Sequence, residues 1–381
     1  MTVQKNILVA IPCLMLGGTE YQTLNLVKAL KESGYAVTVL CYFEYDATMV
    51  QYMENAGANV LLMTENGRRP QKFSALLWAL FSGFKKALKE VAPAVVHVQY
   101  MAPGSLAILL FKLLGVKRVI ATAHVPGHIY RRKWIPQLIA QYVTESFLCV
   151  SQSSEEAFFE EKAALFSKDL FKQGRKHFTI YNCVETGCAQ PKTINHQPLT
   201  TVGIVSRLSY EKGIDILISA LPNILKQNPN VTLLIVGKGS EKEKLHALAG
   251  KLGVADAITW AGLQPKERLP EFYAQMDMVV IPSRFEGFGL TAIEAMGYGI
   301  PVVASAVDGL KEVVVDGESG ILFESENPEA LANVIIDLIK DDAKREVLTK
   351  AGKKRVKEHF SYTLYQKKIT ELYEAVTGSR K

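Results

Sequence analysis

The sequence predicts an α/β protein made of two doubly wound domains with a cleft between them. Short apolar runs alternate with helical patterns along the whole chain, and the alternation begins again after residue 195. Strands that alternate with helices favour parallel sheets covered by helices on both faces. The chain has 381 residues, which is the length of two domains of ordinary size.

In the first half of the chain, short apolar runs predict strands at residues 7–11, 36–41, 59–62, 95–98, 119–122 and 147–150. Apolar residues at helical spacing predict helices between them, such as 20–31 and 73–89. The stretch 91–111 contains no charged side chain, but Pro93 and Pro103 interrupt it. We therefore expect a buried strand, a turn and a buried helix there, and no membrane span.

In the second half, the same patterns predict strands at 201–206, 232–236, 278–282 and 302–304, and helices at 214–226, 241–252 and 289–297. The segment 190–198 is polar and carries two prolines, as linkers often do. We therefore place the two domains at 1–190 and 191–361. A last helix begins near residue 362 and runs toward 381; it either extends the second domain or packs back on the first.

Composition narrows the class of protein. Hydrophobic residues make up 48% of the chain and charged residues 22%, which excludes a disordered or collagen-like protein. The five cysteines are odd in number and form no C-x-x-C, so we expect neither a disulfide framework nor a zinc knuckle, and a reducing, cytoplasmic location. The N-terminus lacks the pattern of a signal peptide. The net charge of +6 permits an anionic partner, but no basic stripe interleaved with aromatic residues points to nucleic acid.

Two glutamates and two glycines follow the strand predicted at 278–282. Glu286 lies in the loop, and Glu294 lies early on the next helix. Gly287 and Gly289 allow backbone amides to approach an anion beside the start of a helix. Ligands of open α/β sheets bind beyond the carboxyl ends of the strands, and carboxylates there suit sugar hydroxyls that flank a phosphate. Either glutamate alone is better explained as a surface residue, but its pairing with the glycine loop favours a binding site.

Two cations follow the strand predicted at 201–206. Arg207 and Lys212 lie at its carboxyl end and before a helix. Together they have the charge to neutralise a diphosphate, which arginine contacts in a bidentate manner and lysine as a point charge. Taken alone, they are more simply explained as surface cations.

The first half of the chain offers two further candidates. The pair Gly17 and Gly18 follows the first strand and allows a tight turn and a close approach of the backbone. Thr19 and Gln22 have the spacing of a capping box at the start of a helix. His124 follows the fifth predicted strand, where a functional role is slightly favoured over a structural one.

Several motifs do not occur. There is no G-x-G-x-x-G, which disfavours a nicotinamide or flavin dehydrogenase, and no Walker lysine motif or G-x-S-x-G. The chain also has no D-x-D, so an Mg²⁺ site on an Asp pair has no candidate residues. Arg207 and Lys212 would supply the positive charge instead, and we expect neither a metal nor a cofactor.

Together these segments resemble the family 4 retaining glycosyltransferases, the large group 1 family with the GT-B fold of two Rossmann-like domains. The strongest match is the E-x7-E motif formed by Glu286 and Glu294. The second is the R-x4-K pair of Arg207 and Lys212, and the third is the glycine-rich first loop. The resemblance covers almost the whole chain.

The sequence departs from the family pattern at three places. Cys183 stands within a segment that often reads Asn-Gly-Val-Asp, and Ser206 stands where a glycine often precedes the arginine. Asp308 and Gly309 stand where two glycines are common. None of these departures removes a charged group from the expected phosphate site.

The resemblance implies transfer of a sugar from a nucleoside-diphosphate sugar to an acceptor hydroxyl, with retention, in polysaccharide, lipopolysaccharide or glycolipid synthesis. The C-terminal domain would bind the donor, and the N-terminal domain would bind a sugar or lipid-linked acceptor. The implied catalytic residues are His124, Arg207, Lys212 and Glu286. The implied donor-binding residues are Gly17, Gly18, Arg207, Lys212, Gly287, Phe288, Gly289, Leu290 and Glu294. Alternatives are a nucleotide-sugar epimerase or a phosphorylase of the same fold, or a non-catalytic nucleotide-binding protein.

The positive charge is unevenly distributed along the chain. Residues 1–190 contain 20 basic and 14 acidic side chains, whereas residues 191–381 contain 24 of each. Basic residues cluster in 68–89 and 131–135, next to apolar side chains that include Trp134. These apolar side chains either face the domain core or form, with the basic residues, a surface that rests on anionic lipid at the inner face of a membrane. In 68–89 they are Phe73, Leu76, Leu77, Leu80, Phe81 and Phe84.

Overall fold

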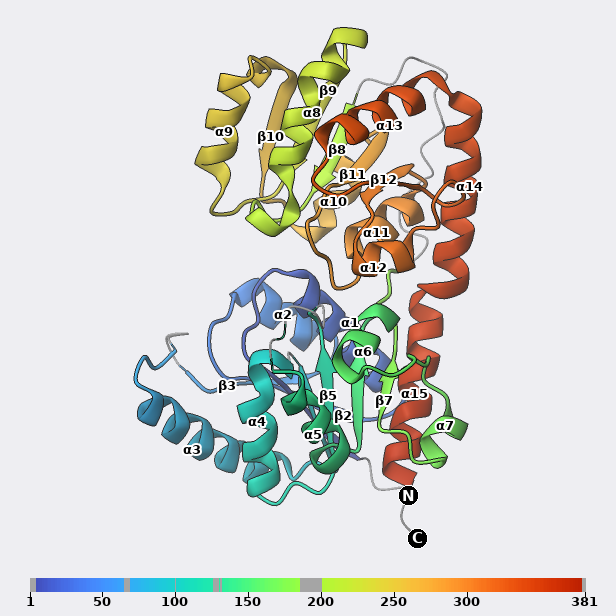
Figure 1. Cartoon of the computed structure of the whole chain (residues 1–381). Coiled ribbons are helices and arrows are strands. Elements are labelled where there is room, and N and C mark those ends of the chain that lie inside the picture. Colours follow the sequence, from blue (N-terminus) through green and yellow to red (C-terminus); the bar gives the residue numbers. More distant parts are fainter. Residues whose placement is uncertain are drawn as a thin grey trace. The chain divides into compact units, whose positions relative to one another are not determined.

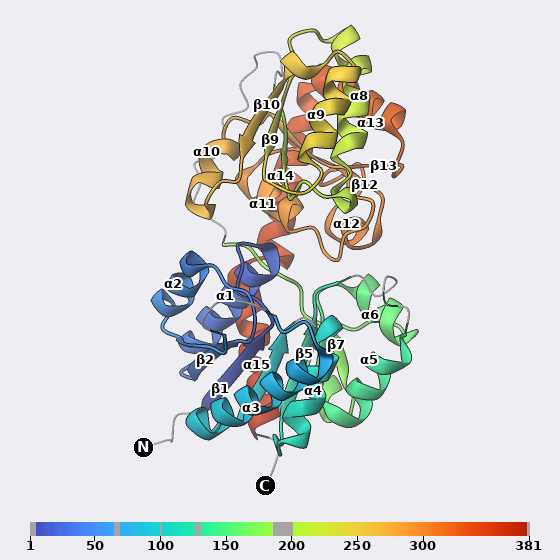
Figure 2. The same ribbon diagram turned by 90° about the vertical axis from the view of Figure 1, so that its left-hand side faces the viewer.

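The structure is a computed structural model that describes residues 5–64, 69–99, 101–125, 130, 132–185 and 201–378. The chain forms two compact units (Figures 1 and 2). Unit 1 consists of Met1–Cys183 and Tyr362–Lys381, and unit 2 consists of Val184–Ser361. The sequence places this boundary at residue 190, and the linker that it predicts at 190–198 lies outside the described residues.

Unit 1 is built on a seven-stranded parallel sheet with the order β3-β2-β1-β4-β5-β6-β7. The strands are β1 (Asn6–Ile11), β2 (Ala36–Cys41), β3 (Asn59–Leu62), β4 (Val95–Gln99), β5 (Val119–Ala123), β6 (Ser146–Cys149) and β7 (His177–Thr179). The first six confirm the predicted strands, with ends that differ by at most one residue, and β7 was not predicted. Every side chain of β4 and β5 is buried, as expected for strands covered on both faces.

Helices cover both faces of this sheet. They are α1 (Gly18–Glu32), α2 (Ala47–Asn55), α3 (Phe73–Val91), α4 (Met101–Leu113), α5 (Trp134–Leu138), the π-helical turn η2 (Ile139–Val143), α6 (Gln152–Phe159), α7 (Lys168–Lys172) and α15 (Tyr362–Gly378). The core on one face comes from α1, α2 and α15, and the core on the other from α3, α4, η2 and α6. Figure 2 shows α3 and α4 on the near side of the sheet and α15 on its far side.

The last helix, α15, is part of unit 1. Its side chains Ile369, Leu372 and Val376 are buried in the same core as α1. Tyr373 is also buried, and its Oη lies 2.7 Å from Nδ1 of His97 on β4. Of the two arrangements that the sequence left open for this helix, the structure has the one in which it returns to the first unit. No helix in the described ranges is long and apolar enough to cross a membrane.

Unit 2 is built on a six-stranded parallel sheet with the order β10-β9-β8-β11-β12-β13. The strands are β8 (Thr201–Val205), β9 (Thr232–Val236), β10 (Ile258–Gly262), β11 (Met278–Ile281), β12 (Val302–Ser305) and β13 (Ile321–Phe323). The helical elements are η3 (Tyr210–Lys212), α8 (Ile214–Gln227), α9 (Lys242–Lys251), α10 (Leu269–Tyr273), α11 (Leu290–Tyr298), α12 (Asp308–Val313), α13 (Pro328–Lys340) and α14 (Asp342–His359). The strands and helices predicted here are confirmed, whereas β10 and β13 were not predicted.

Each sheet has one point at which the strand order reverses direction. In unit 1 this point lies between β1 and β4, and in unit 2 it lies between β8 and β11. Crevices beyond the carboxyl ends of the strands at such a point are where open parallel sheets bind ligands. The glycine pair follows β1, the two cations follow β8, and the E-x7-E motif follows β11. The fold therefore places each of these segments where the strand order of its sheet reverses, which we call the switch point of that sheet.

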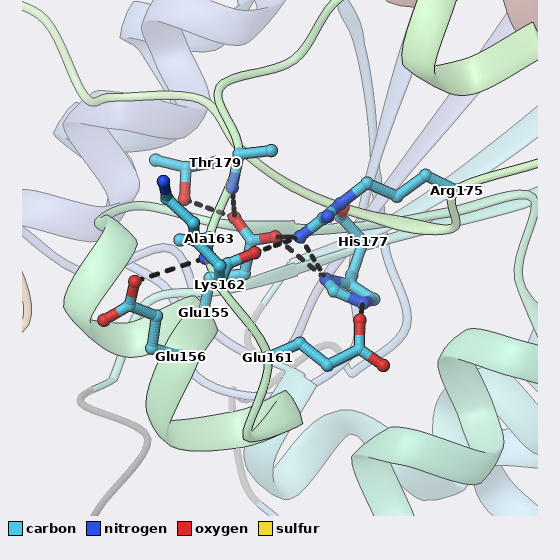
Figure 3. Close-up of polar contacts among 9 residues, drawn as sticks. Glu155, Glu156, Glu161, Lys162, Ala163, Arg175, His177 and Thr179 are labelled. Carbon is cyan, nitrogen blue, oxygen red and sulfur yellow. Dashed lines mark hydrogen bonds and ion pairs between the residues drawn. The ribbon is translucent and has the colours of Figure 1, made fainter. Parts of the chain in front are cut away.

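A buried carboxylate stabilises the edge of the sheet in unit 1 (Figure 3). Glu155, in the first turn of α6, is fully buried. Its carboxylate lies 2.8 Å from Arg175 Nη2, 2.8 Å from His177 Nδ1 and 2.6 Å from Thr179 Oγ1. Burial opposes ionisation of Glu155, but the hydrogen bonds from these three side chains outweigh it, and its pKa is lowered. The carboxylate thus fixes β7 to α6.

We expect Glu155→Gln to destabilise unit 1 by about 3–5 kcal/mol at neutral pH, because it leaves buried donors without their charged partner. The pKa of Glu155 is lower in the folded state than its ordinary value near 4.5, so above that value the ionised carboxylate contributes its full stabilisation to the folded state. This contribution is lost as the pH falls through the folded-state pKa. Unfolding free energies measured from pH 7 to pH 3 should therefore converge for the two proteins in acid. Glu156→Gln, which changes an exposed carboxylate in the same helical turn, is the control. Equal stabilities of all three proteins at pH 7 would contradict this account.

Candidate active site

The loops that follow β8 and β11 bring the two charged motifs of unit 2 into contact. Lys212 Nζ lies 2.6 Å from Glu286 Oε2, and both side chains are largely buried. Ser283 Oγ also approaches this carboxylate, at 3.4 Å. Arg207 is different, because its side chain is 73% exposed and its guanidinium lies 3.2 Å from Glu211. The structure therefore joins Lys212 and Glu286 directly and leaves Arg207 at the solvent-exposed margin of the same loop.

Two glycines allow these loops to come together. Gly213 has a φ of +62°, and a Cβ there would lie 1.9 Å from the carbonyl oxygen of Pro282 at the end of β11. Gly289 has a φ of +107° and is the N-cap of α11. The segment Gly287–Leu290 therefore leads into the N-terminal turn of α11. Amides in that position favour an anion.

The departure from the family pattern at Asp308 and Gly309, where two glycines are common, has a structural explanation. A Cβ at residue 309 would lie 2.6 Å from the Cα of Phe288, so this position requires glycine. The Gly309 amide also donates to the Glu286 carbonyl oxygen at 3.2 Å. Residue 308 is the first residue of α12, a position at which a carboxylate is favourable.

Arg284 was not singled out from the sequence, yet it holds the two loops together. Its guanidinium makes a bidentate ion pair with Asp215, with distances of 2.9 and 2.7 Å, and donates to the Tyr210 carbonyl oxygen at 2.8 Å. It also contacts Glu326 at 2.9 Å and lies 4.1 Å above the Tyr210 ring. The hydrogen bonds to Asp215 raise its pKa further above an already high value. The sequence shows a basic residue directly after Ser283, but it does not show that this residue joins two loops, because its ion-pair partners are distant in the sequence.

Glu294 lies on the first turns of α11. Its Oε2 accepts a hydrogen bond from Tyr273 Oη at 2.9 Å, and Tyr273 is fully buried. Burial raises the pKa of Glu294, although Lys266 and the tyrosine hydroxyl partly oppose this effect. The carboxylate is therefore held in one orientation by a buried neighbour.

In unit 1, the glycine pair begins α1. Gly17 is the N-cap, Gly18 is the first helical residue, and no side chain caps this end. The predicted capping box is therefore wrong, because Thr19 already lies inside the helix. Gln22 instead exchanges hydrogen bonds with the backbone of Cys183, at 2.9 Å and 3.1 Å. A Cβ at residue 17 would meet the carboxylate of the buried Glu20.

His124 follows β5 and lines a small polar cavity of about 20 Å³, which has room for about one water molecule. Its Nε2 lies 2.7 Å from Oε1 of Gln99, the last residue of β4. Gln99 is buried, and its Nε2 has no hydrogen-bond partner among the residues that the structure describes. Burial lowers the pKa of His124 to about 3, so its imidazole is neutral at physiological pH. Gln99 was not predicted, although a polar residue at a strand's carboxyl end was a signal for it.

Comparisons with known proteins agree with this arrangement. Residues 190–355 match the family model "Glycosyl transferases group 1", and residues 16–161 match "Glycosyltransferase Family 4". A D-inositol 3-phosphate glycosyltransferase of Segniliparus rotundus is 31% identical over 77% of this chain and 70% of that protein. An uncharacterized glycosyltransferase of Methanocaldococcus jannaschii is 37% identical over 45% of this chain, which spans 43% of that relative.

The crystal structure of Anabaena HepE in complex with UDP and glucose has the same fold. It superposes with a TM-score of 0.79, at 21% identity, over 97% of this chain and all of that one. Two doubly wound domains with these strand orders are the GT-B architecture, as the sequence predicts. The chain is therefore a GT-B glycosyltransferase that belongs to the group 1, or family 4, glycosyltransferases.

Proposed function

We propose that this glycosyltransferase moves a sugar, with retention, from a nucleoside-diphosphate sugar to an acceptor hydroxyl. The observation that carries the proposal is the contact between Lys212 and Glu286 at the switch point of unit 2. It places a cation for phosphate and a carboxylate for sugar hydroxyls side by side, next to the start of α11. Lys212 alone or Glu286 alone would not indicate a sugar-nucleotide site. A protein that only binds a nucleotide needs the cation for the phosphates but not the carboxylate for the sugar hydroxyls.

Each donor-binding residue receives a distinct task in this proposal. The diphosphate lies near Lys212, Arg207 and the amides at the start of α11, where it competes with Glu286 for the lysine. Glu286 then accepts hydrogen bonds from sugar hydroxyls. Glu294, oriented by Tyr273, accepts hydrogen bonds from the ribose.

The transfer needs stabilisation of the negative charge on the departing diphosphate. The bond between the anomeric carbon and the phosphate oxygen breaks, and its electron pair stays on the phosphate. The acceptor oxygen bonds to the same face of the sugar, and its proton passes to an oxygen of the leaving phosphate. Lys212 and Arg207 stabilise this charge from fixed positions, which is the arrangement that accelerates reactions most effectively. We propose that these cations do so without a metal or a cofactor.

The candidates in unit 1 bind uncharged or anionic groups. Burial keeps His124 neutral, so it hydrogen-bonds a sugar hydroxyl without adding charge. Gln99, next to it, presents a buried amide toward the same small cavity. Gly17 and Gly18 offer the backbone amides at the start of α1 to a phosphate.

A thermal-shift screen with UDP, GDP and ADP identifies the base, and the matching sugar nucleotides are then assayed for transfer. We expect Lys212→Ala and Glu286→Ala to lower the transfer rate, the former by about 10²–10³-fold, as for the loss of one preorganised transition-state donor. Lys350→Ala, which removes an exposed lysine on α14, is the matched control and should retain the wild-type rate. Wild-type rates in both site variants would refute the assignment. Conversion of the donor without an acceptor would instead indicate an epimerase.

The proposal extends to a membrane-borne acceptor, because exposed large apolar side chains are concentrated on a few helices of unit 1. Fifteen large apolar side chains are exposed in the described ranges, and nine of them lie on α3, α4, α5 and η2. These nine are Phe73, Leu77, Trp78, Phe81, Leu109, Leu113, Trp134, Leu138 and Tyr142. On α3, Leu80 and Phe84 face the core and Leu76 packs partly against it. Phe73, Leu77 and Phe81 are exposed, so the core-facing alternative holds for only part of the helix. Likewise α4, predicted to be buried, exposes two leucines.

The same helices are basic. The segments 69–90, 105–118 and 132–145 contain ten Lys and Arg residues and two Glu residues. Exposed tryptophan and phenylalanine among lysines are typical of surfaces that lie in the interfacial region of a bilayer. We propose that this layer, defined by α3, α4, α5 and η2, rests on anionic lipid at the inner face of a membrane.

We expect the protein to sediment with phosphatidylglycerol vesicles at low salt, and less with phosphatidylcholine vesicles or at high salt, because screening weakens the attraction of the lysines. The double variant Phe73→Ser/Trp78→Ser should sediment less. Val347→Ser removes an exposed apolar side chain from unit 2 and should have no effect. Equal sedimentation of the double variant and the wild type would contradict a role for α3.

A further inference from the structure

A second cavity lies in unit 1, between α3 and the loops that follow β2 and β3. It has a volume of about 170 Å³. Tyr42 and Phe43, which line it, come directly after β2, and Met63 comes directly after β3. The cavity therefore lies at the carboxyl edge of the parallel sheet, the edge at which such sheets bind ligands. We call it the α3 cavity.

The α3 cavity is large enough for an apolar group. Its lining includes the side chains of Phe43, Met63, Trp78 and Leu80. An engineered apolar cavity of about 150 Å³ is known to stay dry and to bind benzene. A ring, or a short stretch of an aliphatic chain, is therefore the size and polarity of group that this cavity accommodates.

One residue of the lining carries a hydroxyl that lacks a partner. Tyr42 is 3% exposed, and its Oη makes no hydrogen bond to any residue in the described part of the chain. The nearby hydroxyls of Thr64 and Ser82 donate to backbone carbonyl oxygens, at 3.1 and 3.3 Å. Burial raises the pKa of Tyr42, so the phenol is protonated and is a donor. This hydroxyl has essentially no accessible surface, however, so it lies behind the lining, and the surface that a ligand would meet is mainly apolar.

The α3 cavity lies directly under the exposed face of α3. Trp78 both lines the cavity and is 73% exposed. At its margin, the Arg69 guanidinium lies 4.4 Å above the ring of Phe43. An apolar chain that enters beside Trp78 would thus pass from the exposed face of α3 into the cavity.

We infer that the α3 cavity binds the apolar part of the acceptor, the first carbons of a lipid tail, through its apolar lining. This inference rests on the proposed function only in naming the ligand as the acceptor. It specifies the acceptor as a lipid-linked hydroxyl compound.

The test uses the whole protein and two soluble probes, n-octyl β-D-glucoside below its micellar concentration and methyl β-D-glucoside. Octyl glucoside should raise the melting temperature in a saturable manner, and methyl glucoside at the same concentration should not. Ala79→Leu fills the cavity and should weaken binding of octyl glucoside by about tenfold or more. Ala75→Leu adds the same side chain to an exposed position of α3 outside the cavity and should leave the affinity unchanged. Tyr42→Phe should leave the affinity unchanged, because the Tyr42 hydroxyl does not face the cavity.

Octyl glucoside binding that survives Ala79→Leu, or equal shifts from both probes, would overturn the inference. If Ala79→Leu does not fold, Ser82→Leu introduces the same bulk from a neighbouring lining position and is read in the same way. The readout is binding to unit 1 and needs no sugar nucleotide. Loss of transfer in the Lys212 and Glu286 assay therefore bears on the proposed reaction, and loss of octyl glucoside binding bears on the cavity.

Discussion

The ion pair between Arg284 and Asp215 is the contact on which the geometry of the candidate site depends. Arg284 follows β11 and Asp215 lies in the first turn of α8, so the pair joins the two loops that carry Glu286 and Lys212. The Lys212–Glu286 ion pair and a hydrogen bond from the Arg284 amide to the Glu211 carbonyl oxygen, at 2.9 Å, join the same two loops. The guanidinium is 12% exposed and bidentate, a geometry in which an arginine pair is more rigid than an ordinary surface pair. Gly213 makes the close approach of the loops sterically possible.

The sequence predicted the central strands of both sheets well and the edge strands poorly. Interior strands such as β4 and β5 are buried on both faces, and a continuous apolar run identifies them. The three strands that were missed, β7, β10 and β13, all lie at an edge, and β7 and β13 span only three residues each. Short edge strands bury few side chains and so leave little apolar signal. Of the edge strands, β3 was found because it has a clear apolar run.

Much of the candidate site was also visible in the sequence, because its charged residues follow strands within short motifs. The direct contact between Lys212 and Glu286 was not, since it depends on the neighbouring positions of β8 and β11, which are far apart in the chain. Gln99 was missed for a similar reason, because it becomes a candidate only through its contact with His124, which follows the adjacent strand. The Thr19 capping box failed because a glycine N-cap with the right backbone geometry needs no side chain. The α3 cavity has no sequence signature, because its lining comes from three separate segments.

The return of α15 to unit 1 has a consequence for how the protein forms. Unit 1 is discontinuous, and α15 supplies the partner of His97 and part of the core beneath α1. A ribosome releases α15 only after all of unit 2 has been made, whereas unit 2 is continuous and has its complete core at once. Unit 2 can therefore complete its core before unit 1, whose sheet face stays uncovered until α15 has been made. Loss of the last twenty residues would accordingly damage the unit that begins the chain, and leave the neighbouring one intact.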